Sequence, residues 1–139
     1  MADIHTGESL NIRYYASGMY DREALDRLNH LLRCHYTNDV KTIDVKLLDL
    51  LCDISDIFGR YKQVQIISGY RSSAYNEYLR SLGRNVAKHS LHLLGLAIDF
   101  VIPGVSTYKL FNSARSFAVG GVGHYSKFVH IDTGRIRYW

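Results

Sequence analysis

Three polar residues stand within the most hydrophobic parts of this 139-residue chain. His92 and Asp99 bracket the apolar run LLGLAI, and His130 lies within the later segment KFVHIDTG. A buried, unpaired carboxylate is costly, so Asp99 needs a cation or a dense set of hydrogen-bond donors. Two histidines and one aspartate are typical ligands of a catalytic zinc ion whose fourth position holds water. The pattern therefore indicates a metal site that activates water for attack on a carbonyl group.

A purely structural interpretation of the same residues is also open. Asp99 would then form an ion pair with Arg71, and the two histidines would be hydrogen-bonded residues of the core. A histidine followed at this spacing by an aspartate is a weak pattern on its own. The residues alone do not decide between the two interpretations.

The segments around these residues predict how they are positioned. The run LAIDFVI (96–102) is too short for a helix and is bounded by Gly95 and by a proline–glycine pair, so we expect a buried strand. Alternation along this strand places Asp99 on the face opposite Ile98 and Phe100. A bend at Gly95 would bring His92 back beside Asp99. The final segment, KFVHIDTGRIRYW, predicts two short strands around its threonine–glycine pair, with Phe128, His130 and Asp132 on one face.

Apolar periodicity predicts the other elements. We expect helices over 21–36, 44–58, 73–82 and 106–118, strands within 5–15 and over 64–68, and a glycine-rich bend over 119–125. Asp44 is the expected N-cap of the second helix, and Gly59 its expected end. This order predicts one α+β domain over residues 1–139, in which helices pack on a small, mainly antiparallel sheet.

The composition and charge of the chain indicate which kinds of molecule it could bind. The net charge of +4 fits attraction to a polyanion, but the basic residues are scattered and no nucleic-acid-binding motif is present. No apolar run is long enough to span a membrane, and the opening residues do not resemble a signal peptide. Cys34 and Cys52 are expected to be free thiols on facing helices, with a disulfide left open. We expect a monomer that binds neither nucleic acid nor the membrane interior.

Several segments resemble one known family. SGYRS (68–72), SLHLLGLAID (90–99) and FVHIDTGRIRYW (128–139) are similar to the signature segments of the murein endopeptidase K family. IHTGESL (4–10) and GGVGHY (120–125) are similar as well, so the resemblance covers nearly the whole chain. The family belongs to the zinc D-Ala-D-Ala metallopeptidases, whose fold is shared by the hedgehog signalling domain.

The resemblance implies a set of roles. His92, Asp99 and His130 would be the zinc ligands, and Arg71 would anchor the substrate or polarise its carbonyl group. The implied activity is zinc-dependent hydrolysis of peptidoglycan stem peptides, at cross-links that involve D-amino acids. That substrate implies a location in the periplasm or cell envelope.

The general base is not evident in the sequence. Lys127 occupies the position at which related carboxypeptidases carry an acidic base, and Phe128 replaces the first histidine of an H-x-H pattern used in another branch. Asp132 would serve as a base or would orient His130, and His124 would serve as a base or stabilise the tetrahedral intermediate. A D-Ala-D-Ala carboxypeptidase or dipeptidase, and a non-catalytic, zinc-stabilised module that binds the cell wall, therefore remain as alternatives.

Overall fold

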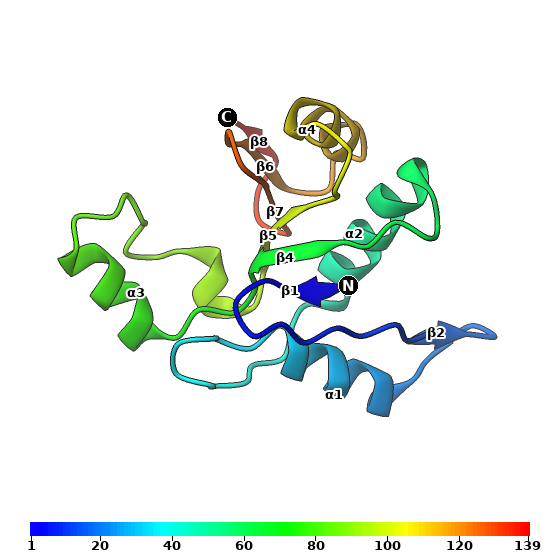
Figure 1. Ribbon diagram of the computed structural model, residues 1–139, viewed down its shortest axis with the longest axis horizontal. Helices are drawn as coiled ribbons and strands as arrows, with labels where there is room; N and C mark the ends of the chain where they lie inside the picture. The colour runs from blue at the N-terminus through cyan, green and yellow to red at the C-terminus, as the bar shows by residue number, and fades with distance from the viewer.

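The computed structural model describes residues 1–139 and contains one six-stranded sheet with four α-helices around it (Figure 1). The strands occur in the order β1 (Ala2–Asp3), β4 (Gln65–Ser68), β5 (Ala97–Val101), β7 (Val129–Asp132), β6 (Gly121–His124) and β8 (Arg137–Tyr138). The helices are α1 (Arg22–Leu31), α2 (Val45–Phe58), α3 (Ser73–Ser81) and α4 (Thr107–Ser116), with a 3₁₀ helix η1 (Leu91–Leu94) before β5. A separate small hairpin joins β2 (Tyr15–Ala16) and β3 (Met19–Tyr20).

The sheet is antiparallel at its centre and parallel at its edges. Strand β5 pairs antiparallel with β4 and β7, and β7 pairs antiparallel with β6. The edge strands β1 and β8 pair parallel with β4 and β6. The α+β class expected from the sequence is confirmed.

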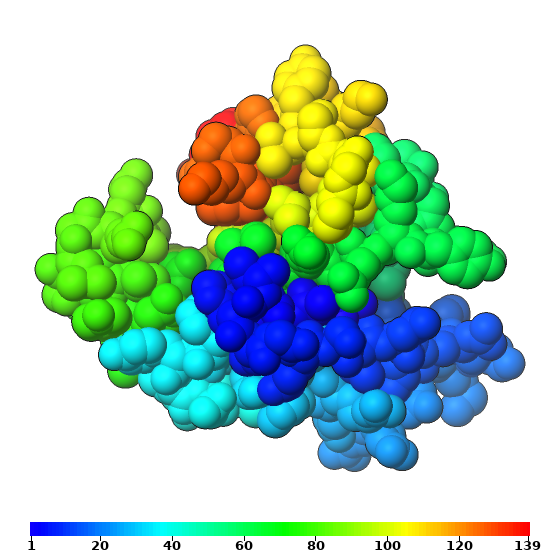
Figure 2. Space-filling view, viewed as in Figure 1, coloured from blue at the N-terminus to red at the C-terminus, as the bar shows by residue number.

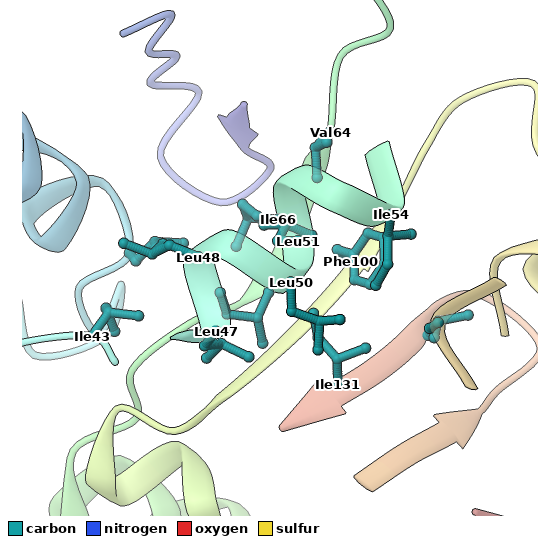
Figure 3. Close-up of a cluster of buried hydrophobic side chains, with 14 of the residues drawn as sticks. Ile43, Leu47, Leu48, Leu50, Leu51, Ile54, Val64, Ile66, Phe100 and Ile131 are labelled. Atoms are coloured by element: carbon teal, nitrogen blue, oxygen red, sulfur yellow. The ribbon is translucent and has the colours of Figure 1, made fainter. Parts of the chain in front are cut away.

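The two faces of the sheet have different surroundings. Helices α2 and α4 pack against the face that carries Ile98 and Phe100 of β5 and Ile131 of β7, which are fully buried. Figure 3 shows side chains of α2 meeting Ile66, Phe100 and Ile131, which come from three neighbouring strands. Each such side chain contributes about 1.5–3 kcal/mol by leaving water. Because side chains alternate along a strand, this core fixes the opposite orientation for Asp99.

Helix α3 differs from the other three helices because Asn76 is its only buried residue. It begins directly after Ser72, whose side chain accepts a hydrogen bond from the backbone N–H of Tyr75 as an N-cap. Figure 1 shows α3 on one side of the molecule, apart from α1, α2 and α4. The helix therefore borders the sheet instead of covering it.

Several predicted elements agree well with the structure, among them the helix predicted over 73–82, which is α3. The second helix begins after Asp44, whose side chain accepts from the N–H of Lys46, and ends at Gly59. The strand predicted over 64–68, the strand over 96–102 and the helix after Ser106 are also present. Each has a strong local signal, namely a cap or a short apolar run between breakers.

Two expectations in the first part of the chain were wrong. No long strand forms within residues 5–15, because the chain folds back on itself and Leu10 donates its N–H to the carbonyl of Met1. The first strand is instead at residues 2–3, beside β4. Helix α1 ends at Leu31, short of residue 36, and Cys34 donates its N–H to the carbonyl of Asp39 in a turn.

The expected bend over 119–125 was also wrong, because residues 121–124 form strand β6. Its glycines are required by close neighbours and not by a turn. A Cβ atom on Gly121 would collide with the Asp132 carboxylate, and one on Gly123 would lie 2.7 Å from the Trp139 ring. Glycine at these positions thus allows neighbouring side chains to lie directly against the strand.

Two further findings concern the membrane and the thiols. None of the helices has the length and hydrophobicity needed to cross a bilayer. Both cysteines are free thiols, with Cys34 buried and Cys52 half-buried. Cys52 lies on α2 as expected, but Cys34 lies in the turn after α1 and not on a helix.

Candidate metal centre

The structure brings His92, Asp99 and His130 together on the sheet face opposite α2 and α4. One ligand atom from each residue lies within 4.8 Å of the others. Asp99 Oδ1 is 3.3 Å from His92 Nε2 and 2.8 Å from His130 Nδ1. Two atoms bonded to one tetrahedral zinc ion lie roughly 3.3 Å apart, given zinc–ligand bonds of about 2.0–2.1 Å. The three side chains therefore have the spacing of a metal-binding set.

A backbone carbonyl fixes the orientation of the His92 ring. His92 Nδ1 lies 2.8 Å from the carbonyl oxygen of Gly69, which can only accept a hydrogen bond. Nδ1 therefore carries a proton, and the other ring nitrogen, Nε2, faces Asp99. Gly95 adopts a left-handed conformation (φ 70°) at the end of η1, and this turn returns the chain to β5.

A carboxylate fixes the orientation of the His130 ring. His130 Nε2 lies 3.0 Å from Asp132 Oδ2, while Nδ1 faces Asp99. Asp132 is fully buried, and its other donors are the backbone N–H groups of Gly121 and Gly134 and the guanidinium of Arg137. Metal-ligating histidines commonly donate their second ring N–H to a carboxylate in this way.

The protonation equilibria show how strongly this cluster favours negative carboxylates. Burial alone would raise the pKa of Asp99, but the charge of His92 and the hydrogen bond from His130 hold it well below its usual range. Burial would lower the pKa of His130, but hydrogen bonds to Asp132 and Asp99 raise it to about 8. Burial opposes ionisation of Asp132 too, yet its hydrogen bonds lower its pKa to about 2.

These residues fit a divalent cation. Positive charge on the two histidines is what stabilises the buried Asp99 carboxylate, and a metal ion supplies that charge when the histidines are neutral ligands. Each ring presents one nitrogen toward Asp99, and the other nitrogens are held by Gly69 and Asp132. Three protein ligands leave room for a water molecule or a substrate atom.

Arg71 lies beside the cluster but is not paired with it. Its guanidinium is buried, its Nη1 donates to Asn76 Oδ1 at 3.2 Å, and its Nε has no hydrogen-bond partner in the protein. Burial lowers the pKa of Arg71, and the charge of Asp99 partly offsets this. No ion pair joins Arg71 to Asp99, so the structural interpretation in which these two residues neutralise each other does not describe the fold. A buried donor without a partner suits a group that arrives with the substrate.

Asn76 was not identified from the sequence. It is almost fully buried on α3, donates to the carbonyl of Ala87 at 3.1 Å and accepts from Arg71. The Asn76 side chain therefore holds the guanidinium of Arg71, which lies five residues earlier in the chain. The sequence does not indicate this role, because an asparagine within a predicted helix is common and the residues it contacts are known only once the chain is folded.

His124 and Lys127 lie away from the cluster. In β6, Gly123 is opposite His130 and His124 is opposite Val129, so the His124 side chain points to the α4 face of the sheet. There its Nε2 contacts the hydroxyl of Thr107 at 3.1 Å. Lys127 is exposed in the turn between β6 and β7. The structure thus does not bring His124 to the metal-binding side chains.

Aromatic residues border the cluster on the β7 side. The rings of His130 and Trp139 are 5.3 Å apart, and Trp139 Nε1 donates to the hydroxyl of Tyr125 at 2.9 Å. Tyr125 also stacks on Phe128, with ring centroids 4.6 Å apart. Figure 2 shows the surface hollowed between the green lobe that contains α3 and the orange segment before β7. Arg71 donates its backbone N–H to the carbonyl of His92, and Trp139 lies beside His130, so the cluster has Arg71 next to one histidine and Trp139 next to the other.

Comparison with known proteins agrees with this geometry. The sequence profile of the M15 peptidase family described as "Peptidoglycan L,D-endopeptidase MepK" matches residues 1–139. The chain belongs to this family. It is 44% identical over 139 residues to the peptidoglycan L,D-endopeptidase MepK of Escherichia coli K12, an alignment covering 99% of the chain and 76% of that relative. It is 39% identical to the probable MepK of Haemophilus influenzae, covering 99% of the chain and 75% of that protein.

Membership fixes the class of enzyme. M15 peptidases depend on a metal, so the chain is a metallopeptidase and the His92–Asp99–His130 cluster is its candidate metal centre. The resemblance that the signature segments indicated is confirmed over the whole chain.

Proposed function

We propose that the chain is a zinc-dependent peptidoglycan peptidase that hydrolyses stem-peptide cross-links containing D-amino acids. The observation that carries this proposal is the His92–Asp99–His130 cluster with the buried Arg71 guanidinium beside it, whose Nε has no partner in the protein. Residues 1–139 act as one catalytic domain. The enzyme works as a monomer in the periplasm or cell envelope, where its substrate lies.

The proposed substrate rests on both the relatives and the charges. The relatives are named for an L,D-endopeptidase activity on peptidoglycan. Stem peptides carry free carboxylates, and a guanidinium can bind a carboxylate through two parallel hydrogen bonds. The net charge of +4 also favours approach to an anionic polymer.

His92, Asp99 and His130 would hold zinc. When bound, zinc lowers the pKa of its water and polarises a carbonyl group. Arg71 binds a substrate carboxylate or carbonyl with its free Nε–H and Nη–H groups, which Asn76 keeps in place. Gly69 and Asp132 hold the two imidazole rings in the tautomers that ligation requires.

We assign Asp132 an orienting role and not that of a general base. Its two oxygens already accept hydrogen bonds from His130, Arg137 and two backbone N–H groups, and no part of it is exposed to solvent. A base must reach the water whose proton it takes. The donors around Asp132 occupy the positions from which it would do so.

The test is digestion of defined muropeptides by the purified protein, with the products identified by mass. Cross-linked dimers should yield monomers with zinc and should remain intact with a chelator. His92→Ala should remove both zinc binding and cleavage, whereas His124→Ala should keep both, because His124 lies on the other face of the sheet. Release of free D-Ala alone would identify a carboxypeptidase. Zinc-loaded protein that binds sacculi without cutting any bond would refute the proposal.

A further inference from the structure

Trp139 is unusually well anchored for a residue that remains exposed. Its backbone N–H donates to Val122, and its carbonyl accepts from His124 at 2.7 Å. Its indole N–H donates to Tyr125, and the Arg137 guanidinium lies 4.9 Å from its ring centroid. Despite these contacts, 45% of its surface is open to solvent. The fold thus fixes the position of the ring without burying it.

Gly123 makes this position available. It is opposite His130 in the β6–β7 register, so a side chain there would point to the metal-binding face. A Cβ atom at Gly123 would lie 2.7–2.8 Å from three atoms of the indole ring. Contacts under about 3 Å between such atoms do not occur, so only glycine lets the indole lie over this strand beside His130.

The exposed aromatic surface continues away from the metal cluster. Trp139 is 5.3 Å from the His130 ring, and Tyr125 and Phe128 extend the aromatic surface into the segment before β7. This segment borders the hollow seen in Figure 2, across from the lobe that begins after Arg71. A substrate held at the cluster would therefore have Arg71 on one side and an aromatic wall on the other.

We propose that Trp139, supported by Gly123, Tyr125 and Arg137, is a substrate-binding residue that packs against the aliphatic part of the stem peptide next to the cleaved bond. The ligand chemistry is a methyl or methylene group, as alanine and diamino-acid residues provide, because an exposed indole gains most from covering apolar carbon. This assignment rests on the proposed peptidase function and adds to it a specificity element that none of the metal-binding residues supplies.

Tyr138, the last residue of β8 and the neighbour of Trp139, offers a matched control. It is an aromatic neighbour with nearly the same exposure, 42%, but its hydroxyl donates to the carbonyl of Arg115 on the α4 side. Trp139→Ala and Tyr138→Ala therefore each remove one exposed aromatic ring near residue 139. Only Trp139→Ala removes a ring on the metal-binding face, where it would contact the substrate.

The kinetic experiment measures cleavage of a cross-linked muropeptide by zinc-loaded wild-type protein, Trp139→Phe, Trp139→Ala and Tyr138→Ala. Trp139→Ala should raise KM on the order of tenfold, the size of one aromatic contact, with zinc content and Tm close to wild type. The KM of Trp139→Phe should lie between those of wild type and Trp139→Ala, and the KM of Tyr138→Ala should equal that of wild type. An unchanged KM in Trp139→Ala would overturn the assignment while leaving the peptidase function intact.

Fluorescence gives an independent readout, because Trp139 is the only tryptophan in the chain. Adding the muropeptide product to zinc-loaded protein should produce a saturable blue shift as the indole is shielded from water. Calorimetric binding without any spectral change would refute the contact. If the protein cleaves no muropeptide, the proposed function fails, and titration with the intact dimer still decides the assignment: a blue shift supports it and constant emission overturns it.

Discussion

At the scale of single residues, Arg137 acts on the metal site through another side chain. It donates from both terminal nitrogens to Asp132, which in turn accepts from His130. The guanidinium therefore stabilises the negative charge that keeps the His130 ring oriented, although it does not contact any of the three candidate ligands. Residues that orient a metal ligand in this way contribute to metal affinity although they do not touch the metal.

Arg137→Leu should weaken zinc binding by about 10- to 100-fold, because Asp132 loses its main cationic partner and His130 loses its fixed orientation. Competition with a chromophoric chelator measures the affinity directly and does not depend on catalysis. Arg135→Leu is the matched control, since Arg135 is exposed and only its backbone carbonyl contacts the site. Equal affinities for the two variants would show that Asp132 holds His130 without help from Arg137.

Arg71 offers a second test at this scale. Arg71→Lys keeps the positive charge but loses the planar set of donors, including the free Nε–H. KM for a cross-linked muropeptide should rise about 10- to 100-fold, with zinc content unchanged. Arg80→Lys is the control, because Arg80 lies nearby on α3 but pairs with Glu77 at the surface. A KM that does not change in Arg71→Lys would remove Arg71 from the substrate site.

At the scale of elements, strand β6 supports the site with two glycines that have different neighbours. Gly121 faces the carboxylate of Asp132 and the guanidinium of Arg137, whereas Gly123 faces the indole of Trp139. A methyl group at the first position would disturb the support of the metal ligands. At the second it would displace only a side chain at the edge of the sheet.

The two glycines should therefore separate metal binding from substrate binding. Gly121→Ala should reduce zinc affinity, while Gly123→Ala should keep zinc affinity and raise KM, with tryptophan emission shifted to the red as the indole moves into water. Zinc titration, muropeptide kinetics and emission spectra on both variants check this pair. Loss of zinc affinity in both variants would contradict this prediction, because it would show that a change beside Trp139 also disturbs the residues that support the metal ligands.

The elements also show which parts of the fold can be predicted from sequence. Strand β5 and helix α2 were predictable because each is delimited by local signals, such as Gly95, Asp44 and Gly59, that act within a few residues. Strand β6 was not predictable in this way. Its glycines reflect contacts with Asp132 and Trp139, and nothing near them in the sequence indicates which residues those neighbours are.

The same distinction applies to the site. The three candidate ligands were detectable because polar residues inside apolar strands need partners. The groups that hold the site residues in place were missed, namely the Gly69 carbonyl that contacts His92 and the Asn76 amide that contacts Arg71. Their residue types are ordinary for a turn and a helix, and their roles depend on the packing of α3 and η1 beside the sheet.

At the scale of the whole molecule, the metal cluster joins parts of the chain that are otherwise held by separate contacts. His92 comes from η1, Asp99 from the central strand β5 and His130 from β7, and the loop before α3 contributes the carbonyl that holds His92. A metal that binds only the folded chain stabilises it in proportion to the logarithm of its free concentration. Bound metal should thus stabilise the arrangement of η1 and the α3 loop against the sheet.

Zinc should raise Tm measurably, and chelation should reverse the change. At a free zinc concentration about 1,000 times Kd, the gain is about 4 kcal/mol, which corresponds to roughly 8–16 °C for a domain of this size. Differential scanning calorimetry with and without chelator measures the shift. His92→Ala should lose most of it, whereas His124→Ala should retain it in full, because His124 contacts Thr107 on the opposite face. An equal zinc-induced shift in wild type and His92→Ala would place the metal elsewhere in the molecule.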